Sequence, residues 1–155
     1  MADGSDGMSL SPSAASSDQT IAAVFYPASN SINQIVFDFN NTNFMLWLNE
    51  SGYYQGNDWV GFTSTPLTAD AQLIIIVYDS LYSTLYKNAG SGEQESGDRR
   101  NAMGGTSAIF ARYDTGGYNM VNTSWIGEIV IYSQALSEPD RNILEVYFNN
   151  KWGIF

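Results

Sequence analysis

The C-terminal stretch of the chain constrains the fold more than any other, because an apolar strand there runs directly into a capped helix. Ile129 and Ile131 are expected on one side of this strand, and Val130 and Tyr132 on the other. Since both sides are apolar and charges are few, we expect the strand to lie in the interior of a sheet.

The helix that follows has a marked beginning and a marked end. Ser137 can cap its first turn through the hydroxyl, and Pro139 is tolerated there because its missing N–H would be unpaired anyway. Asp140 complements the positive end of the helix, and Gly153 supplies the left-handed residue that commonly ends one. Residues at helical spacing form an apolar stripe, which we expect to be structural. They are Leu144, Tyr147, Phe148 and Lys151, continuing into Trp152.

Together, this strand and helix resemble the C-terminal signature of LamG-like, concanavalin A-like jelly-roll domains. There, a Gly-Glu-Ile-aliphatic-aliphatic-Tyr strand leads through Leu-Ser to a helix ending in Lys-Trp-Gly-aliphatic. The matching residues are Gly127, Glu128, Ile129, Tyr132, Leu136, Ser137, Arg141, Tyr147, Lys151, Trp152 and Gly153. The opening ADGSDGMSL is similar to the first strand of the same domains. The resemblance implies an all-β, two-sheet antiparallel jelly-roll sandwich with one short C-terminal helix.

Length and composition predict a single domain over residues 1–155. A chain of 155 residues can bury about two thirds of its unfolded surface, and no change of composition divides it. Aromatic residues make up 14% of the chain, with ten Tyr against six Lys and Arg, which is typical of antiparallel sheets. We expect roughly eight to ten strands, the range of a two-sheet jelly roll.

Runs of apolar residues indicate where strands are expected. The run 20–27 is apolar on both faces, and we expect it to pair with the run 34–40 in one sheet. The run 44–49 is expected to form a hairpin with the run before it. Its alternation places Phe44, Leu46 and Leu48 opposite Met45 and Trp47.

Two polar stretches are expected to be loops. The stretch 50–57 is rich in Gly, Tyr and Asn, so its aromatic side chains are candidates for exposure. The stretch 88–105 is longer than most loops, and such loops are usually functional or disordered.

Charge and composition exclude several classes of partner and chemistry. The net charge of −10 repels phosphate backbones and anionic lipid, so we expect no nucleic-acid partner and no membrane partner. The start of the chain lacks the pattern of a signal peptide, and no run is long enough to span a membrane. Without Cys there is no disulfide framework, which fits a cytosolic or virion protein and does not exclude a secreted one.

Catalysis is not expected. The chain has no His and no Cys, so His-based triads, thiol nucleophiles and the usual zinc sites cannot form. Catalytic relatives on the jelly-roll fold carry Glu-x-Asp-x-x-Glu on one strand, and this motif is missing. Glu93 and Glu95 share its first spacing, but they lie in a predicted loop and are interpreted as solvated charges. We therefore predict no catalytic residues and no enzymatic activity.

The densest group of candidate ligand-binding residues lies in and after the first polar stretch. It consists of Tyr53, Tyr54, Asp58 and Trp59. Tyr and Trp offer amphipathic contact area at low entropy cost, so this group can stack on a sugar ring or contact a partner loop. For Trp59 alone, a core position in a short strand is the preferred interpretation.

A second candidate binding group flanks a Gly-Gly pair. It consists of Arg112, Asp114, Tyr118 and Asn119, whose polar groups can bind sugar hydroxyls. An ion pair between Arg112 and Asp114 at a strand end is the alternative. Calcium is the usual metal of this fold, and the acidic residues that could hold it are Asp3, Asp6, Asp79 and Asp114. Because their spacing fits no calcium loop, we predict no metal site and no cofactor.

These observations predict a non-catalytic binding or structural module with a glycan or protein partner. The resemblance implies a virion surface or extracellular setting, as in capsid decorations, phage tail fibres and secreted bacterial surface proteins. In that setting we expect a homo-oligomer or a particle-bound state. One alternative is a carbohydrate-binding module of a larger secreted glycan-processing protein. The other, a glycosidase or polysaccharide lyase, requires two carboxylates or a Tyr base in one groove.

Overall fold

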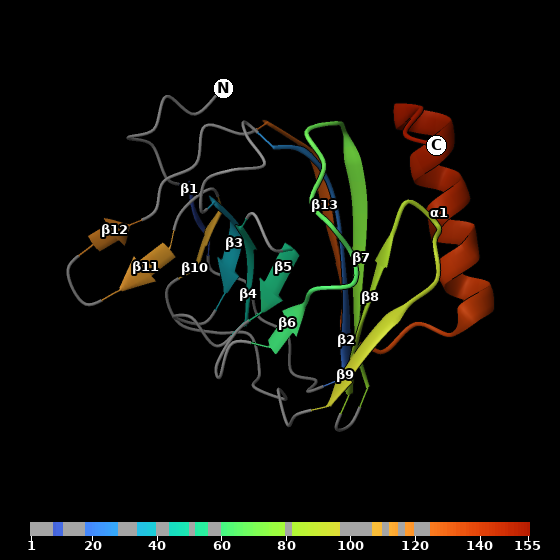
Figure 1. Ribbon diagram of the computed structural model, residues 1–155, viewed down its shortest axis with the longest axis horizontal. Helices are drawn as coiled ribbons and strands as arrows, with labels where there is room; N and C mark the ends of the chain where they lie inside the picture. The colour runs from blue at the N-terminus through green and yellow to red at the C-terminus, as the bar shows by residue number, and fades with distance from the viewer. Residues whose placement is uncertain are drawn as a thin grey trace.

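The structure of the chain is a computed structural model (Figure 1). It describes residues 8–10, 18–27, 34–39, 44–49, 52–55, 60–79, 82–96, 107–109, 112–114, 117–119 and 125–155.

The described residues form thirteen β-strands and one α-helix. The strands of the first half are β1 (Met8–Leu10), β2 (Gln19–Tyr26), β3 (Gln34–Phe39), β4 (Phe44–Asn49), β5 (Gly52–Gln55), β6 (Val60–Phe62) and β7 (Gln72–Asp79). The later elements are β8 (Tyr82–Lys87), β9 (Glu93–Ser96), β10 (Ser107–Ile109), β11 (Arg112–Asp114), β12 (Gly117–Asn119), β13 (Trp125–Tyr132) and α1 (Glu138–Trp152).

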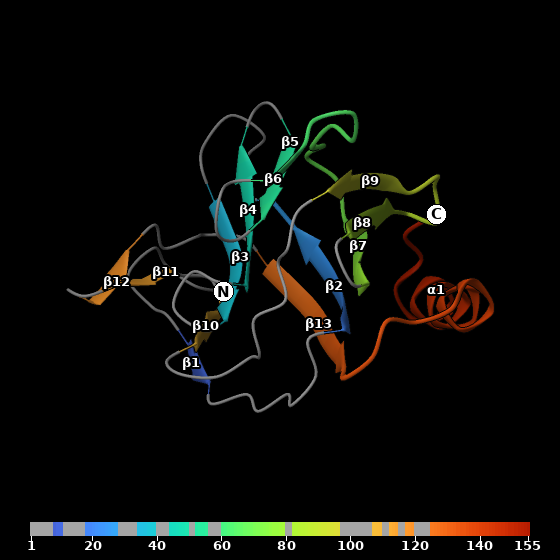
Figure 2. The same ribbon diagram turned by 90° about the horizontal axis from the view of Figure 1, so that it is seen from below.

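Two antiparallel sheets lie face to face. The six-stranded sheet has the order β1-β10-β3-β4-β5-β6, and the five-stranded sheet has the order β13-β2-β7-β8-β9. The helix α1 covers the outer face of the five-stranded sheet, and the β11–β12 hairpin lies beyond β3 on the opposite side of the molecule (Figures 1 and 2). The predicted fold class, a two-sheet antiparallel sandwich with one C-terminal helix, is confirmed.

Two apolar clusters hold these layers together. The larger cluster lies between the sheets and includes Phe25, Phe37 and Phe62, each fully buried. The smaller one lies between the five-stranded sheet and α1, where Leu144 and Phe148 of the helix pack on the sheet. Alternate residues of β2 and β7 contribute to the two clusters, which explains why both strands are apolar on both faces.

The helix begins and ends as the sequence predicts. Asp140 donates its backbone N–H to the hydroxyl of Ser137 over 3.4 Å, and Ser137 is the N-cap. Gly153 adopts a left-handed conformation at φ 61°, and its N–H bonds to the carbonyl of Asn149 over 2.8 Å. The stripe is less uniform than predicted, since Phe148 is fully buried while Tyr147 is 44% exposed.

The prediction that β13 lies in a sheet interior is wrong. β13 is the end strand of the five-stranded sheet and pairs only with β2 among the described strands. Its two-sided apolar pattern has another cause, because Ile129 and Ile131 face the cluster between the sheets while Val130 and Tyr132 face the cluster under α1.

Three further expectations on strands are corrected. β2 and β3 do not share a sheet, because β2 pairs with β7 and β13 while β3 pairs with β4 and β10. The predicted loop 50–57 contains β5, and the predicted loop 88–105 contains β9, which pairs with β8. The predicted β3–β4 hairpin is confirmed. Whether residues 1–155 form a single domain stays a prediction.

Candidate functional site

One row of residues crosses the outer face of the six-stranded sheet. Ile35 is the register partner of Trp47, Trp47 of Tyr54, and Tyr54 of Gly61. Directly paired residues of antiparallel strands share a face of the sheet. The next row, Leu48, Tyr53 and Phe62, belongs to the opposite face, where Leu48 and Phe62 are buried in the cluster between the sheets.

The described residues of the row become less buried from β3 towards the end strand β6. Ile35 on β3 is fully buried, whereas Trp47 on β4 is half-buried. Gly61, on the end strand β6, is also half-buried and has no side chain to cover the position beside it. The row therefore contains a half-buried Trp47 and, two strands further along, a glycine without a side chain.

The segment 63–71, which follows β6, is anchored to the other sheet. Ser64 donates its backbone N–H to Oε1 of Glu93 on β9 over 2.9 Å. Lys87 on β8 donates its Nζ to the carbonyl of Pro66 over 2.7 Å and to the hydroxyl of Thr68 over 3.2 Å. Burial lowers the pKa of Lys87, although the charge of Asp70 opposes this shift. These bonds hold the segment that follows β6 against β8 and β9 of the other sheet.

The two predicted tyrosines fall on different faces. Register places position 54 on the outer face with Trp47, and position 53 on the inner face with Leu48. At positions 53 and 54 the structure describes the backbone only. Asp58 and Trp59 lie outside the described residues, so their predicted role stays a prediction.

The second predicted group lies in the β11–β12 hairpin. Arg112 is the register partner of Asn119, and Tyr118 pairs with Tyr113, one step along the hairpin from Asp114. Only the backbone of these residues is described. The hairpin lies beside β3 on the outer side of the six-stranded sheet, whereas position 54 is two strands further along the sheet order (Figures 1 and 2). The binding role of this group stays a prediction.

The acidic candidates behave differently from expectation. Glu93 and Glu95 do not lie in a loop, because they belong to β9, and Glu93 is not a free solvated charge, because it accepts the bond from Ser64. Within the part of the chain that the structure describes, no three His, Cys, Asp or Glu residues gather at a possible metal site. Asp3 and Asp6 are outside that part.

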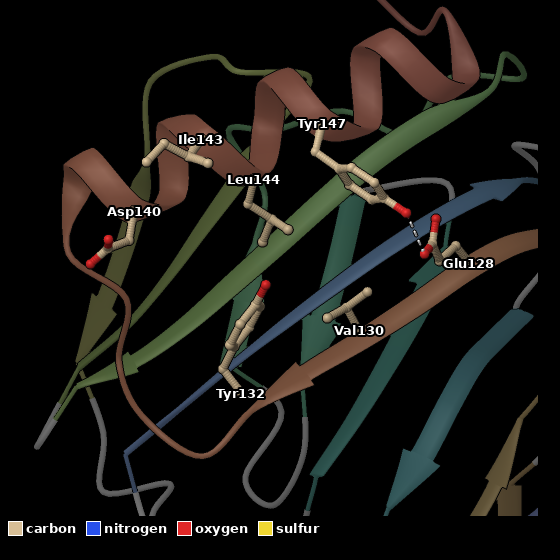
Figure 3. A pocket seen from close by; sticks show the side chains of 7 residues that line it. All are labelled: Glu128, Val130, Tyr132, Asp140, Ile143, Leu144 and Tyr147. Atoms are coloured by element: carbon tan, nitrogen blue, oxygen red, sulfur yellow. Dashed lines mark hydrogen bonds between the residues drawn. The ribbon is translucent and has the colours of Figure 1, made fainter.

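A second surface lies between β13 and α1, where a groove of about 380 Å³ opens (Figure 3). Glu128, Val130 and Tyr132 line it from the strand, and Asp140, Ile143, Leu144 and Tyr147 line it from the helix. A smaller hollow of about 270 Å³ continues it towards Leu136 and shares Tyr132, Asp140 and Ile143 with it. The groove has an apolar floor and acidic groups at both ends.

At one end of this groove, Glu128 ties β13 to the helix. Its Oε1 accepts a bond from the hydroxyl of Tyr147 over 3.0 Å (Figure 3). Its Oε2 accepts bonds from Lys151 Nζ over 3.0 Å and from Trp152 Nε1 over 3.1 Å. Burial acts to raise the pKa of Glu128, but these bonds outweigh it and hold the pKa below the ordinary value of 4.5.

Five residues of the C-terminal signature thus meet at one place, namely Gly127, Glu128, Tyr147, Lys151 and Trp152. The rings of Trp125 and Trp152 contact edge to face at 5.4 Å, and Gly127 lies against both. A side chain at Gly127 would begin 3.0 Å from each ring. Glu128 is the only acidic residue of β13, so the strand alone gave no sign of this network, whose other members are on α1.

Trp47 and Gly61 were not predicted as site residues. The alternation of the run 44–49 does place Trp47 opposite the buried face, and that signal was available. Its exposure depends on what lies over β4, which local sequence does not specify.

No protein-family model matches the chain, and no curated protein sequence matches it. Several solved structures are similar to the chain in fold. The receptor-binding domain of botulinum neurotoxin C/D mosaic serotype has a TM-score of 0.66 at 17% identity, over 92% of this chain and 40% of that one. NanB sialidase from Streptococcus pneumoniae has a TM-score of 0.69 at 17% identity, over 86% of this chain and 26% of that one.

A third similar structure is domain 4 of AbnA, a GH43 extracellular arabinanase from Geobacillus stearothermophilus, in complex with arabinotriose. Its TM-score is 0.62 at 17% identity, over 90% of this chain and 72% of that one. The chain therefore has the β-sandwich fold found in these proteins, and it spans less than half the length of the toxin and NanB chains. Within the described residues, no helix combines the length and apolar character needed to cross a bilayer.

Proposed function

We propose that this chain is a non-catalytic glycan-binding module whose binding face is the outer side of β4, β5 and β6. The observation that carries the proposal is the row formed by Trp47, Tyr54 and Gly61. It combines a half-buried tryptophan, a neighbouring tyrosine position on the same face, and a glycine on the end strand of the sheet.

The chemistry of the row suits a sugar ring. A pyranose or furanose presents a face of C–H groups that packs on an aromatic ring, and burial of this apolar area stabilises the complex. Gly61 adds no side chain beside position 54, and the segment 63–71 after β6 is bonded to β8 and β9 of the other sheet. Because the chain carries a net charge of −10, neutral oligosaccharides are the favoured ligands.

Structures of the same fold support a glycan partner. Domain 4 of AbnA is in complex with arabinotriose, and botulinum neurotoxin type C, at a TM-score of 0.65, is described as interacting with two ganglioside molecules. These ligands belong to those proteins, and they lead us to propose a glycan as the ligand of this chain.

Two settings use such a module. One is a virion surface, where the domain would decorate a capsid or a tail fibre as a homo-oligomer or bound to the particle. The other is a larger secreted glycan-processing protein, in which the chain would be the carbohydrate-binding module. Both place the binding face outside the cell.

The proposal is tested by glycan binding of matched variants. A glycan array that includes arabinotriose identifies the best neutral ligand, and calorimetric titration then measures its affinity for Trp47→Ala, Tyr54→Ala, Tyr53→Phe and Tyr82→Ala. Trp47→Ala and Tyr54→Ala should each weaken binding at least about tenfold, or ~1.4 kcal/mol. Tyr53→Phe should bind like the wild type because position 53 belongs to the inner row.

Tyr82 is the matched control, since it is a 48% exposed tyrosine on the other sheet. Tyr82→Ala should leave the affinity unchanged. Loss of binding in Tyr82→Ala, or full binding in both Trp47→Ala and Tyr54→Ala, would show that the ligand binds elsewhere.

A further inference from the structure

Two exposed aromatic side chains lie opposite each other at one end of the five-stranded sheet. Tyr26, the last residue of β2, is 48% exposed, and Trp125, the first residue of β13, is 42% exposed. They are register partners, so they share a face of the sheet. Val24, two residues before Tyr26, belongs to the cluster under α1, which places the pair on the outer face. Apolar residues exposed singly need no explanation, but adjacent ones are candidates for a binding surface.

The end of α1 holds the ring of Trp125 in place. This ring contacts the ring of Trp152 edge to face at 5.4 Å, and Trp152 donates its Nε1–H to Glu128 over 3.1 Å. Gly127 makes the ring contact possible, because a side chain there would begin 3.0 Å from both rings. Trp125 is therefore fixed before a ligand arrives, which lowers the entropic cost of binding.

The charged groups that adjoin Trp152 neutralise each other. Lys151 pairs with Glu128 at 3.0 Å, and its Nζ lies 5.5 Å from the centre of the Trp152 ring. An ammonium group has three N–H donors. Among the described residues, Glu128 and the hydroxyl of Tyr147 accept two of them, so one N–H remains for a ligand. Exposed rings, one hydrogen-bond donor and no uncompensated charge suit a neutral, hydroxylated ligand such as a sugar.

The aromatic pair is open and faces away from the proposed glycan-binding face. Tight small-molecule sites enclose most of the surface of their ligand, whereas two adjacent rings cover only one side of a sugar. The pair lies on the outer side of the five-stranded sheet, and the glycan-binding face lies on the outer side of the six-stranded sheet (Figure 1). A short oligosaccharide bound to one surface therefore does not reach the other.

We propose that Tyr26 and Trp125 form a second, weaker glycan-binding site, with which one molecule bridges two chains of a neutral glycan. The inference rests on the proposed function, because the stronger site is the face of β4, β5 and β6. At oligosaccharide concentrations that saturate the stronger site, the second site stays largely empty. On a polymer that carries many glycan copies, the second contact becomes effectively intramolecular and raises the apparent affinity.

The probe is the best neutral glycan of the array, used both as a free oligosaccharide and in many copies on polyacrylamide. Calorimetric titration measures the affinity for the free form, and biolayer interferometry measures the affinity for the immobilised polymer. Tyr26→Ala and Trp125→Ala should each lower the affinity for the polymer at least about tenfold, and leave the affinity for the free form close to wild type. Both side chains are exposed, so both variants should fold.

Tyr82→Ala is the matched control, because Tyr82 is also a 48% exposed tyrosine of the five-stranded sheet. Its register partner is Asp79, so no second ring lies opposite it. Tyr82→Ala should bind both forms like the wild type. Light scattering should give all variants the same mass. A Trp125→Ala protein with fewer subunits than the wild type would place this ring in a protein contact and overturn the proposal.

Wild-type affinity for the polymer in both Tyr26→Ala and Trp125→Ala, or an equal loss in Tyr82→Ala, would also overturn it. So would an equal loss for the free and the polymeric glycan in Trp125→Ala, because the aromatic pair would then be the principal site. The proposed function fails by a different result, which is full affinity for the free glycan in both Trp47→Ala and Tyr54→Ala.

Discussion

The outer faces of the two sheets are used differently. On the five-stranded sheet, α1 covers the outer face with Leu144 and Phe148, and Arg141 stacks on Tyr86 at 3.8 Å while it pairs with Glu145. On the six-stranded sheet, the outer face holds a half-buried Trp47, and the β11–β12 hairpin lies beside β10 and β3. Under the proposed function, this difference is a division of labour, in which the covered face contributes stability and the other face recognition.

The largest expected effect concerns the covered face. Phe148→Ala should lower the free energy of unfolding by about 3–5 kcal/mol, because the ring is fully buried between α1 and the sheet. Glycan affinity of the folded protein should be unchanged. Chemical denaturation measures the first quantity and calorimetric titration the second, with Val146→Ala as an exposed control. A folded Phe148→Ala protein that no longer binds glycan would break the division between the two faces.

A middle-sized effect is expected where β13 meets the end of α1. Gly127→Val should cost about 1–3 kcal/mol, since the new side chain would start 3.0 Å from the rings of Trp125 and Trp152 and displace them. Removing the half-exposed ring in the double variant Trp125→Ala/Gly127→Val should recover part of the loss, and denaturation of the four proteins of this cycle measures the coupling. Strict additivity would mean that Gly127 is not chosen for ring packing.

The smallest effect is expected at Glu128 and depends on pH. Glu128→Gln should cost about 1 kcal/mol at pH 7, because the bonds from Tyr147, Lys151 and Trp152 lose their charge assistance. The lowered pKa of Glu128 means that its contribution is present above the unfolded value of 4.5 and is lost as the pH falls through the folded value.

Thermal unfolding between about pH 7 and pH 3 measures this dependence. Wild type and Glu128→Gln should converge at the acid end of the range. A difference in stability that stays constant over the whole range would contradict the role of the ionised carboxylate.

Local signals predicted the C-terminal part of the fold. The cap at Ser137 and the left-handed Gly153 fixed the ends of α1, because capping depends on residues within one turn. The two-sided pattern of β13 was misread, since a helix over the outer face produces the same apolar pattern as a second sheet neighbour. Whether a strand has a helix over its outer face or a second neighbour in the sheet depends on tertiary packing.

Pairing between strands far apart in sequence accounts for other differences between the predicted and the observed strands. The pairing of β2 with β13 joins residues far apart in sequence, so periodicity could not place β2 and β3 in different sheets. β9 was missed because its residues Glu93–Ser96 are all polar and lack the composition of a typical strand. For the binding face, the sequence identified Tyr54 as a candidate, but only the register separates it from Tyr53 and joins it to Trp47.

Hydrogen–deuterium exchange with and without the best neutral glycan tests the central claim most directly. Saturating ligand should slow exchange over residues 44–62, which include β4, β5 and β6, and leave residues 125–152 unchanged. Protection of β13 and α1 instead, with none over 44–62, would contradict the account and place the glycan on the covered sheet.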